Sequence, residues 1–325
     1  MSLDVLIVDI HADQYADELR RDCPDLRLHT YPNRAALPAD LSSIDVLVSF
    51  GVSIDDDVLR RLTDLKWVQS LATGVDHFLR SAHLAPGALI TSGRGIHGWM
   101  MREMTIHLML CLTHNTPRQA ADQRDHVWER RLWSLLYEKT AVVVGIGVAG
   151  IAIGEALNAL GMKVIGVSGT PREIAGFSKI LPSERLIEAA AQADFLINVL
   201  PASPQNIDLF DAALFKAMKP SAYFVNVGRG ETVVEAALLA ALREGRIAGA
   251  GLDVFRQEPL PPTSPFWDLP NVVITPHIGG YVPEYEHYVM PILIDNMRQF
   301  LAGRVGEMRN VVPRLSAPVS PPLPA

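Results

Sequence analysis

Cysteine is nearly absent from this sequence: among 325 residues only Cys23 and Cys111 are present. Neither belongs to a Cys-x-x-Cys pair or stands at a spacing from histidine that binds a metal ion. We therefore expect two incidental thiols in a reducing compartment and no metal site.

The sequence also lacks a leader, a long apolar run and an excess of positive charge. Its first residues, MSLDVLIVDIHAD, have no basic segment, and Asp4 and Asp9 interrupt the apolar run, which predicts a strand and not a signal peptide. The apolar segment Thr105–Leu112 is too short to cross a bilayer. The formal net charge of −7, with both signs scattered, argues against nucleic acid or a membrane surface as the partner. We expect a cytoplasmic protein that binds small molecules.

Apolar residues are abundant, at 49% of the chain, and occur in short runs that alternate with helical stretches. This alternation is typical of βαβ units and predicts two α/β domains, each with its own parallel sheet. The expected helices cover residues 13–22, 55–62, 97–130 with a break at Pro117, and 281–302. The expected strands are DVLIVDI, LRLHTY, DVLVSF, WVQSLA and ALITSG, and then TAVVVGIG, KVIGVS, FLINVL, AYFVNVG, GAGLDVF and VVITPH.

A glycine-rich turn, Gly145-Ile-Gly-Val-Ala-Gly150, follows the first strand of the second series and precedes a helix. This context favours a dinucleotide site, in which glycines permit the turn and the close approach of a pyrophosphate to the helix N-terminus. A glycine-rich turn without a ligand is the alternative. The turn residues predicted to bind the cofactor, a nicotinamide dinucleotide, are Gly145, Gly147, Val148, Ala149 and Gly150.

The next strand ends in GVSGTPRE, where a dinucleotide site usually has an acid that binds the ribose hydroxyls. No acid occurs before Glu173. Ser168, Gly169, Thr170 and Arg172 offer hydroxyls and a cation instead, which favours the 2′-phosphate of NADP over NAD. The alternative is that Arg172 points to solvent and that both cofactors are accepted.

Three later stretches, VNVGRG, GLDVFRQEP and ITPHIGG, supply Arg229, Glu258 and His277 at the ends of expected strands. Taken singly, each residue is more simply a solvated surface or loop residue. Together they suit the reduction of a 2-keto acid, because a cation can bind the carboxylate while a histidine, kept protonated by a neighbouring carboxylate, donates a proton to the carbonyl oxygen.

These motifs resemble those of the D-isomer-specific 2-hydroxyacid dehydrogenases, over about Leu3–Pro313. The resemblance rests also on ATGVDHF, REMTIHLML, NVLPASPQN, FVNVGRGETVVEAALLAAL, LDVFRQEPLPP and NVVITPHIGG. It implies an α/β fold of two doubly wound parallel-sheet domains, with a Rossmann domain inserted into a flavodoxin-like domain. The implied substrate-binding domain is 1–97 with 282–313, the NAD(P)-binding domain is 98–281, and 314–325 is a proline-rich tail.

The resemblance also assigns roles to residues. It implies that Arg229 binds the substrate, that His277 is the acid/base and Glu258 its partner, and that the N–H groups of Gly74 and Val75 hold the substrate carboxylate. It implies that Asp253 faces the nicotinamide carboxamide. The other residues that it places around the cofactor are Thr105, Leu200, Pro201, Asn206, Val227, Gly228, Gly279 and Gly280.

The sequence departs from the family pattern at Asn206, where threonine is more common, and at Glu231 and Glu235, where small residues or aspartate are usual. These departures leave the reaction class intact and affect the cofactor geometry. Glu258 argues against formate dehydrogenases, which pair the histidine with glutamine. The compact chain looks most similar to the glyoxylate/hydroxypyruvate reductases, and the family implies a homodimer. A nucleotide-sensing corepressor scaffold with the same fold is the alternative function.

Overall fold

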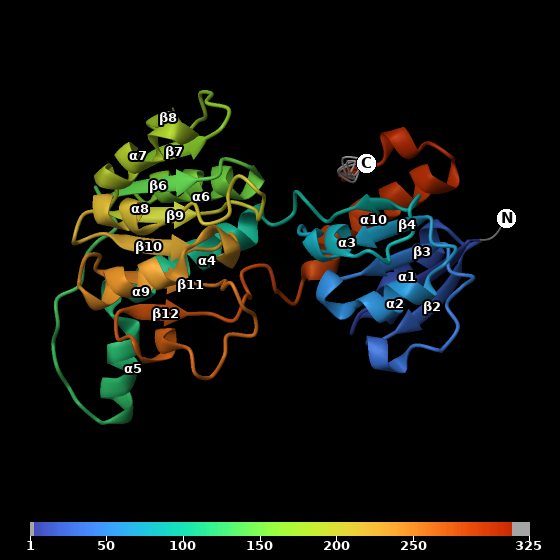
Figure 1. Ribbon diagram of the computed structural model, residues 1–325, viewed down its shortest axis with the longest axis horizontal. Coiled ribbons are helices and arrows are strands. Elements are labelled where there is room, and N and C mark those ends of the chain that lie inside the picture. The colour runs from blue at the N-terminus through green and yellow to red at the C-terminus, as the bar shows by residue number, and fades with distance from the viewer. Residues whose placement is uncertain (1–2, 314–325) are drawn as a thin grey trace, which may run out of the picture. The chain divides into compact units, whose positions relative to one another are not determined.

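The computed structural model describes residues 3–313, and the predicted proline-rich tail lies outside them. The chain divides into two units (Figure 1). The first unit contains residues 3–96 and returns at 283–313, and the second contains residues 97–282. The second unit is therefore inserted into the sequence of the first.

The first unit has a five-stranded parallel sheet with the order β2-β1-β3-β4-β5, which is the flavodoxin-like doubly wound order. Its strands are β1 (Asp4–Val8), β2 (Arg27–Tyr31), β3 (Val46–Ser49), β4 (Trp67–Ser70) and β5 (Leu89–Thr91). Its helices are α1 (Ala12–Asp22), α2 (Asp56–Arg61), α3 (Asp76–Arg80) and α10 (Tyr285–Leu301), with 3-10 turns η1 (Arg34–Ala36), η2 (Gly51–Ser53) and η6 (Val305–Glu307).

Helices cover both faces of this sheet, so the strands are apolar runs without alternation. Leu6 and Val8 of β1 pack in one cluster with residues of α2 and α3. On the other face α10 packs beside α1, and the ring of Phe300 in α10 lies 5.1 Å from that of Trp67 in β4. Buried Asn296 donates to Gln69 Oε1 at 2.9 Å and so fixes α10 to the sheet.

The second unit has a seven-stranded parallel sheet with the order β12-β11-β10-β9-β6-β7-β8, a Rossmann arrangement with a seventh strand. Its strands are β6 (Thr140–Val144), β7 (Lys163–Ser168), β8 (Lys179–Pro182), β9 (Phe195–Asn198), β10 (Tyr223–Asn226), β11 (Gly249–Leu252) and β12 (Val272–Ile274). Its helices are α4 (Gly98–His114), α5 (Thr116–Arg124), α6 (Val148–Ala159), α7 (Leu186–Gln192), α8 (Ala212–Ala217) and α9 (Glu235–Arg243), with 3-10 turns η3 (Ser183–Arg185), η4 (Gly230–Thr232) and η5 (Pro265–Asp268).

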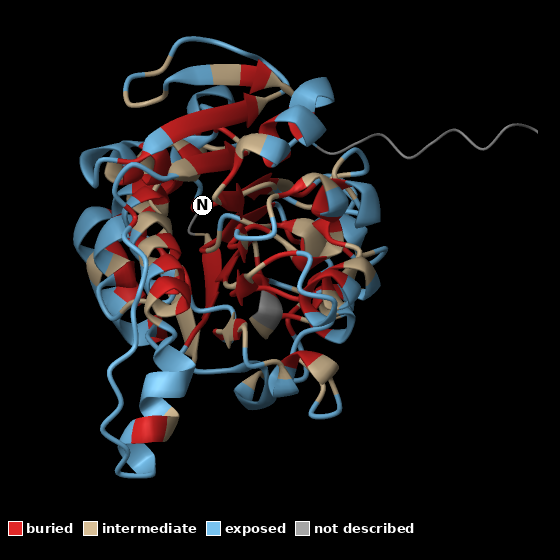
Figure 2. Ribbon diagram, turned by 90° about the vertical axis from the view of Figure 1, so that its left-hand side faces the viewer, coloured by how far each residue is buried: buried red, intermediate tan, exposed pale blue. Residues whose placement is uncertain are grey.

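The core of the second unit lies on both faces of its sheet. Val142 and Val144 of β6 pack with α7, α8 and α9, whereas Ala141 and Val143 pack with α4 and α6. The strands are drawn as buried and the outer faces of the helices as exposed (Figure 2). The strand order reverses between β6 and β9, and such a reversal leaves a crevice for ligands at the carboxyl ends of the strands.

The predicted fold class is confirmed, and three details differ from the sequence-based expectation. Strand β8 was not predicted because it is a four-residue edge strand with little buried surface. The expected break near Pro117 is present, because Asn115 adopts a left-handed conformation with φ 52° and a new helix begins there, but the second helix ends at Arg124 and not at residue 130. Helix α10 begins at Tyr285, four residues after the expected start.

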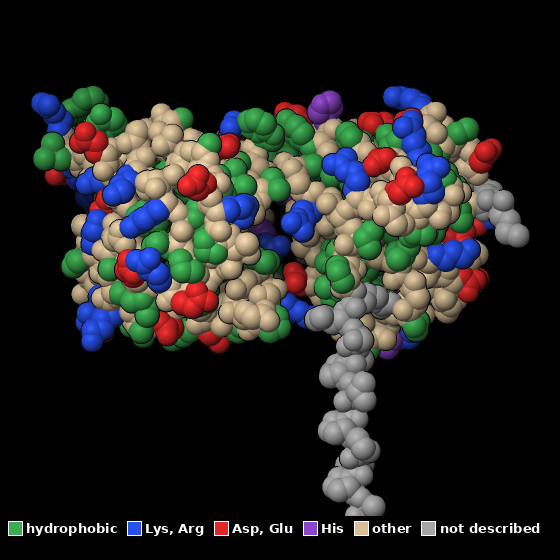
Figure 3. Space-filling model, turned by 90° about the horizontal axis from the view of Figure 1, so that it is seen from above, with side chains coloured by type: hydrophobic (Ala, Val, Ile, Leu, Met, Phe, Trp, Pro, Cys, Tyr) green, Lys and Arg blue, Asp and Glu red, His purple; other side chains and the backbone are tan. Residues whose placement is uncertain are grey.

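No helix within residues 3–313 is long and apolar enough to span a membrane. The same residues contain no group of three histidine, cysteine or acidic side chains that could hold a metal ion. On the face drawn in Figure 3, basic and acidic side chains are interspersed, in keeping with charges of both signs throughout the sequence.

Candidate active site

The glycine-rich turn connects β6 to α6 and is shaped by the absence of side chains. Gly145 has φ +102°, a conformation that favours glycine. A Cβ at Gly150 would lie 2.0 Å from the carbonyl oxygen of Gly145, whereas one at Gly147 would meet no atom within 4 Å. The turn is therefore packed tightly on its inner side and open at Gly147, which fits the close approach of a dinucleotide phosphate.

A cavity of about 370 Å³ lies beside this turn. Its walls come from the turn, from the end of β7, from η3 and α7, and from the segment after β9. Six residues predicted to bind the cofactor line it, namely Gly145, Gly147, Ser168, Gly169, Leu200 and Asn206. Val148 and Ala149 follow in the first turn of α6, where free N–H groups suit phosphate. The shape and lining fit a dinucleotide, although the contact of each residue with it stays a prediction.

The end of β7 carries the neutral and basic segment predicted to select the cofactor. The backbone N–H of Thr170 donates to Ser168 Oγ at 3.2 Å, so the turn is closed by hydroxyl groups and not by an acid. Arg172 Nη2 donates to the carbonyl oxygen of Ile146 at 3.3 Å. The exposed guanidinium is thus held beside the glycine turn, near the rim of the cavity.

Three buried polar side chains fix the loop that carries Arg229. Asn198 ends β9 and Asn226 ends β10, and Asn198 Nδ2 donates to Asn226 Oδ1 at 2.8 Å and to Thr232 Oγ1 at 2.7 Å. The carbonyl oxygen of Arg229 accepts from Thr232 Oγ1 at 2.7 Å and from Asn226 Nδ2 at 3.3 Å. The N–H of Gly228 donates to Asn226 Oδ1 at 3.1 Å. The backbone around the half-buried Arg229 is therefore held by side chains from two strands.

Glu258 and His277 form a hydrogen-bonded pair, with Glu258 Oε2 2.6 Å from His277 Nδ1. The other carboxylate oxygen of Glu258 accepts from the N–H of Phe255 at 2.9 Å. Burial opposes ionisation of Glu258, but the bonds from His277 and Phe255 and the charges of His277 and Arg229 outweigh it and hold the pKa of Glu258 below its usual range. Because Glu258 contacts Nδ1, the Nε2 atom of His277 is the one available for proton transfer.

The turn that presents His277 depends on Asp253, whose carboxylate is almost fully buried. Asp253 Oδ1 accepts from Thr275 Oγ1 at 2.6 Å and from the N–H of Ile278 at 3.0 Å, and Oδ2 accepts from the N–H of Gly279 at 3.0 Å. His277 has φ +53°, which is uncommon for a residue with a side chain. Asp253 thus anchors the turn on both sides of His277, beyond its predicted role at the carboxamide.

Other residues predicted to bind the cofactor lie within α4 and in the segments that follow β9 and β10. Thr105 is fully buried, and its hydroxyl donates to the Met101 carbonyl oxygen at 2.7 Å. Val227 is buried beside the Arg229 loop, and Asn206 donates to the carbonyl oxygen of Pro201 at 3.0 Å. Their contacts with a cofactor stay predictions.

His97 was not assigned a role from the sequence, yet it lies near the predicted site. A Cβ at Gly280 would be 2.9 Å from its ring. Burial, and in addition the charge of Arg229, lower the pKa of His97 to about 4, so its imidazole is neutral at neutral pH. Asn198 and Asn226 were also given no role from the sequence. The feature that could have indicated one is an asparagine at the end of each of two apolar strands, FLIN and YFVN.

The predicted substrate groups Gly74 and Val75 belong to the first unit, in the loop between β4 and α3. Tyr285 Oη donates to the Leu71 carbonyl oxygen at 2.6 Å, and a Cβ at Gly93 would lie 2.2 Å from that oxygen. The loop is therefore held at its start. Among the hydrogen bonds of residues 3–313, none is donated by the N–H of Gly74 or Val75, and their contact with a substrate stays a prediction.

Comparison with known proteins places this arrangement in a family. A family model described as "D-isomer specific 2-hydroxyacid dehydrogenase, NAD binding domain" matches residues 106–279. The chain is 32% identical over 288 residues to glyoxylate/hydroxypyruvate reductase B of Yersinia pestis, covering 86% of this chain and 87% of that protein. It is 29% identical over 313 residues to a D-3-phosphoglycerate dehydrogenase of Methanocaldococcus jannaschii, covering 95% of this chain but 59% of that longer relative.

Solved structures agree with this placement. A D-isomer specific 2-hydroxyacid dehydrogenase family protein from Aeromonas salmonicida superimposes with a TM-score of 0.88 at 32% identity, covering 96% of this chain and 99% of that one. An NADPH-dependent glyoxylate/hydroxypyruvate reductase from Sinorhizobium meliloti, solved with NADP and sulfate, gives a TM-score of 0.83 at 29% identity, covering 97% and 99%. The chain belongs to the D-isomer specific 2-hydroxyacid dehydrogenase family and is an NAD(P)-dependent oxidoreductase of that family.

Proposed function

We propose that the protein reduces a small 2-keto acid, such as glyoxylate or hydroxypyruvate, to the D-2-hydroxy acid. The observation that carries this proposal is the pair of His277 and Glu258, 2.6 Å apart, with Arg229 close enough to influence the ionisation of Glu258. These are a proton donor, its partner and a cation for a carboxylate. The reductases of Yersinia pestis and Sinorhizobium meliloti, to which the chain is similar, carry that activity in their names.

In the proposed reaction, Arg229 binds the substrate carboxylate and polarises the keto group through its positive charge. The N–H groups of Gly74 and Val75 hold the carboxylate as well. His277 Nε2 gives its proton to the carbonyl oxygen, which becomes the hydroxyl, and takes it back in the reverse direction. Glu258 keeps the imidazole oriented through Nδ1. When bound beside these groups, the reduced nicotinamide supplies the hydride.

We also propose that NADPH is preferred over NADH. The segment from Ser168 to Arg172 offers hydroxyls and a guanidinium where an acid would bind the ribose of NAD. Arg172 is held at the rim of the cavity through the carbonyl oxygen of Ile146. The Sinorhizobium meliloti reductase was solved with NADP, which supports this proposal.

We further propose that the protein is a cytoplasmic homodimer that associates through the second unit. The arm, residues 116–138, contains α5 and the chain that follows it, and α5 projects beyond the sheet of its unit (Figure 1). Asp122 pairs with Arg118 and Arg131 and so orders the arm. The arm nevertheless exposes 95% of Trp128 and all of Leu132. Exposed apolar side chains of this size favour burial against another protein chain.

The test of the reaction is a panel of 2-keto acids with NADPH and NADH, run on the wild type and on His277→Ala. We expect the wild type to turn over small 2-keto acids, and the variant to lose about 10²-fold to 10⁴-fold in kcat, because general acid catalysis is removed. The affinity for NADPH should stay near the wild-type value, and His287→Ala, at an exposed histidine, serves as the control. Binding of cofactor without turnover of any 2-keto acid would favour the alternative, a nucleotide-sensing scaffold.

Glu258→Gln tests the role of the carboxylate. The folded-state pKa of Glu258 is lowered, so its contribution to stability is present above the unfolded value and is lost as the pH falls through the folded value. Glu258 is therefore negatively charged in the pH range in which the proposed reduction needs a protonated His277. Without this charge, the alkaline fall of kcat/KM for reduction should begin at a lower pH. Identical pH profiles for the wild type, Glu258→Gln and the surface control Glu244→Gln would contradict this role.

Arg172→Ala tests the cofactor preference. We expect kcat/KM with NADPH to fall about tenfold to hundredfold, because a charge-assisted contact with the 2′-phosphate is removed, while the value with NADH changes little. Arg185→Ala is the matched control, because Arg185 is on η3 near the same cavity but already binds Glu188 at 2.5 and 2.6 Å. A wild type that prefers NADH would defeat the proposal.

Light scattering of the wild type and of Trp128→Asp tests the dimer. We expect a dimeric wild type and a dimer dissociation constant raised at least about thirtyfold in the variant, because a charge replaces a large apolar contact at the interface. Ile187→Asp, on the exposed side of α7, should remain dimeric. A monomeric wild type would show that the arm has another use.

A further inference from the structure

Arg256 bonds to two other segments of the second unit at once. Its guanidinium Nη2 donates to the carbonyl oxygens of Glu231 and Val233, each at 3.0 Å, and pairs with the Asp208 carboxylate. Glu231 and Val233 follow Arg229 in the chain, and Asp208 belongs to the segment that contains Asn206. One planar cation thus joins the loop of Arg229 to the loop that precedes Glu258. A guanidinium is suited to this because it offers several donors in a fixed plane.

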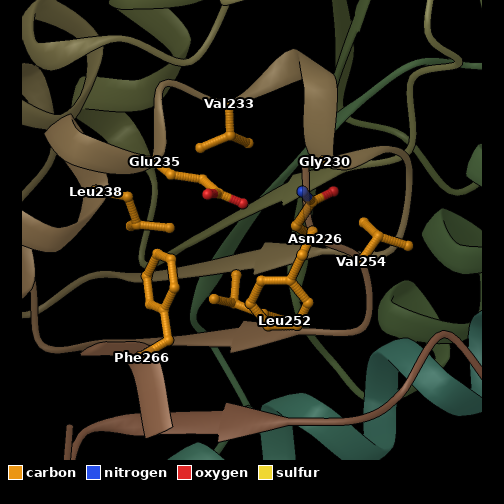
Figure 4. A pocket seen from close by; sticks show the side chains of 9 residues that line it. Asn226, Gly230, Val233, Glu235, Leu238, Leu252, Val254 and Phe266 are labelled. Carbon is orange, nitrogen blue, oxygen red and sulfur yellow. The ribbon is translucent and has the colours of Figure 1, made fainter. Parts of the chain in front are cut away.

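The backbone at Arg256 is held as well. The N–H of Arg256 donates to Glu235 Oε1 at 2.8 Å, while the neighbouring N–H of Phe255 donates to Glu258 Oε1 at 2.9 Å. Glu235 is the first residue of α9, and its carboxylate extends toward Gly230 in the cavity shown in Figure 4. Two adjacent amides are therefore bound by two carboxylates, one of which belongs to the predicted catalytic pair.

The two loops also touch through their backbones. A Cβ at Gly230 would lie 1.9 Å from the carbonyl carbon of Phe255 and 2.3 Å from the nitrogen of Arg256. Gly230 directly follows Arg229, so any shift of the Arg256 backbone is transmitted to the neighbours of both Arg229 and Glu258. The position of one loop fixes that of the other.

We propose that Arg256 and Glu235 are positioning residues that hold the loop of Glu258 against the loop of Arg229. This inference rests on the proposed reaction. Exposed ion pairs contribute little to stability, and Arg256 and Asp208 are both well exposed. The ion pair of Arg256 and Asp208 therefore acts on the relative position of the loops and adds little to the free energy of folding. The arrangement also gives a use to Glu235, where small residues or aspartate are usual in the family, because its side chain accepts from the N–H of Arg256.

The experiment compares the wild type with Arg256→Met, Glu235→Ala and Glu235→Gln. For Arg256→Met and Glu235→Ala we expect kcat/KM for reduction to fall about tenfold to hundredfold, because small displacements of catalytic groups are costly. The alkaline fall of the pH profile should move in the same direction as in Glu258→Gln, by a smaller amount, because both changes weaken the hold of Glu258 on His277. Glu235→Gln keeps an acceptor oxygen and should behave like the wild type.

Arg246→Met is the matched control, because Arg246 pairs only with the surface residue Glu244 among the described ion pairs. An unchanged pH profile in Arg256→Met would overturn the proposal, whether or not kcat/KM or the melting temperature falls, since loss of stability alone does not move the profile. Equal losses of kcat/KM in Glu235→Gln and Glu235→Ala would also overturn the positioning role of Glu235.

Amide hydrogen exchange separates this proposal from the reaction on which it rests. In the full-length protein, exchange of the Phe255 and Arg256 amides should be at least about tenfold faster in Arg256→Met than in the wild type, because their loop opens more often. This result would support the positioning role even if no 2-keto acid is turned over, a finding that would defeat only the proposed reaction. If the wild type is active and the Phe255 and Arg256 amides exchange equally fast in Arg256→Met and the wild type, the positioning role is wrong.

Discussion

The buried carboxylate of Asp253 is the group on which the geometry of the candidate site depends. A non-glycine residue at positive φ costs about 1–3 kcal/mol and persists only where its surroundings impose it. At His277 they do, because Asp253 binds the turn through Thr275, Ile278 and Gly279. Hydrogen bonds to a charged group contribute about 1.5–3 kcal/mol each, enough to offset the strain. The conformation of His277 thus depends on a side chain at the end of the neighbouring strand, β11.

Polar side chains at strand ends also hold other loops along the carboxyl edge of the sheet. Strands β9, β10 and β11 end at or just before Asn198, Asn226 and Asp253. The side chains of Asn198 and Asn226 bind the loops that follow their own strands, and that of Asp253 binds the loop after the neighbouring strand β12. Where a parallel ladder ends, backbone N–H and C=O groups lose their partners, and short polar side chains replace them. Loops held in this way can carry reactive groups without the freedom of a surface turn, which is what a proton transfer requires.

Much of this was predictable from the sequence, because strands, glycine turns and motif order are local features. The strands of both units, apart from β8, and the candidate residues Arg229, Glu258 and His277 were named from such features. The supports of those residues were not. Asn226 binds Asn198 across 28 residues, and Arg256 binds Asp208 across 48. Nothing in the neighbourhood of either residue indicates its partner, since the contact exists only once the strands have been ordered in the sheet.

Arg172 and Arg256 are the same type of residue, but we propose different functions for them because their hydrogen-bond partners differ. Both are exposed arginines in loops of the second unit. Arg256 Nη2 already has a carboxylate and two carbonyl oxygens as acceptors, so this end of its guanidinium is engaged within the protein. Within residues 3–313, the Arg172 guanidinium makes one hydrogen bond, from Nη2 to the carbonyl oxygen of Ile146, which holds it while leaving most of its donors for a ligand. A phosphate beside the glycine turn would therefore meet a cation that is already in place, and binding would cost little further side-chain entropy.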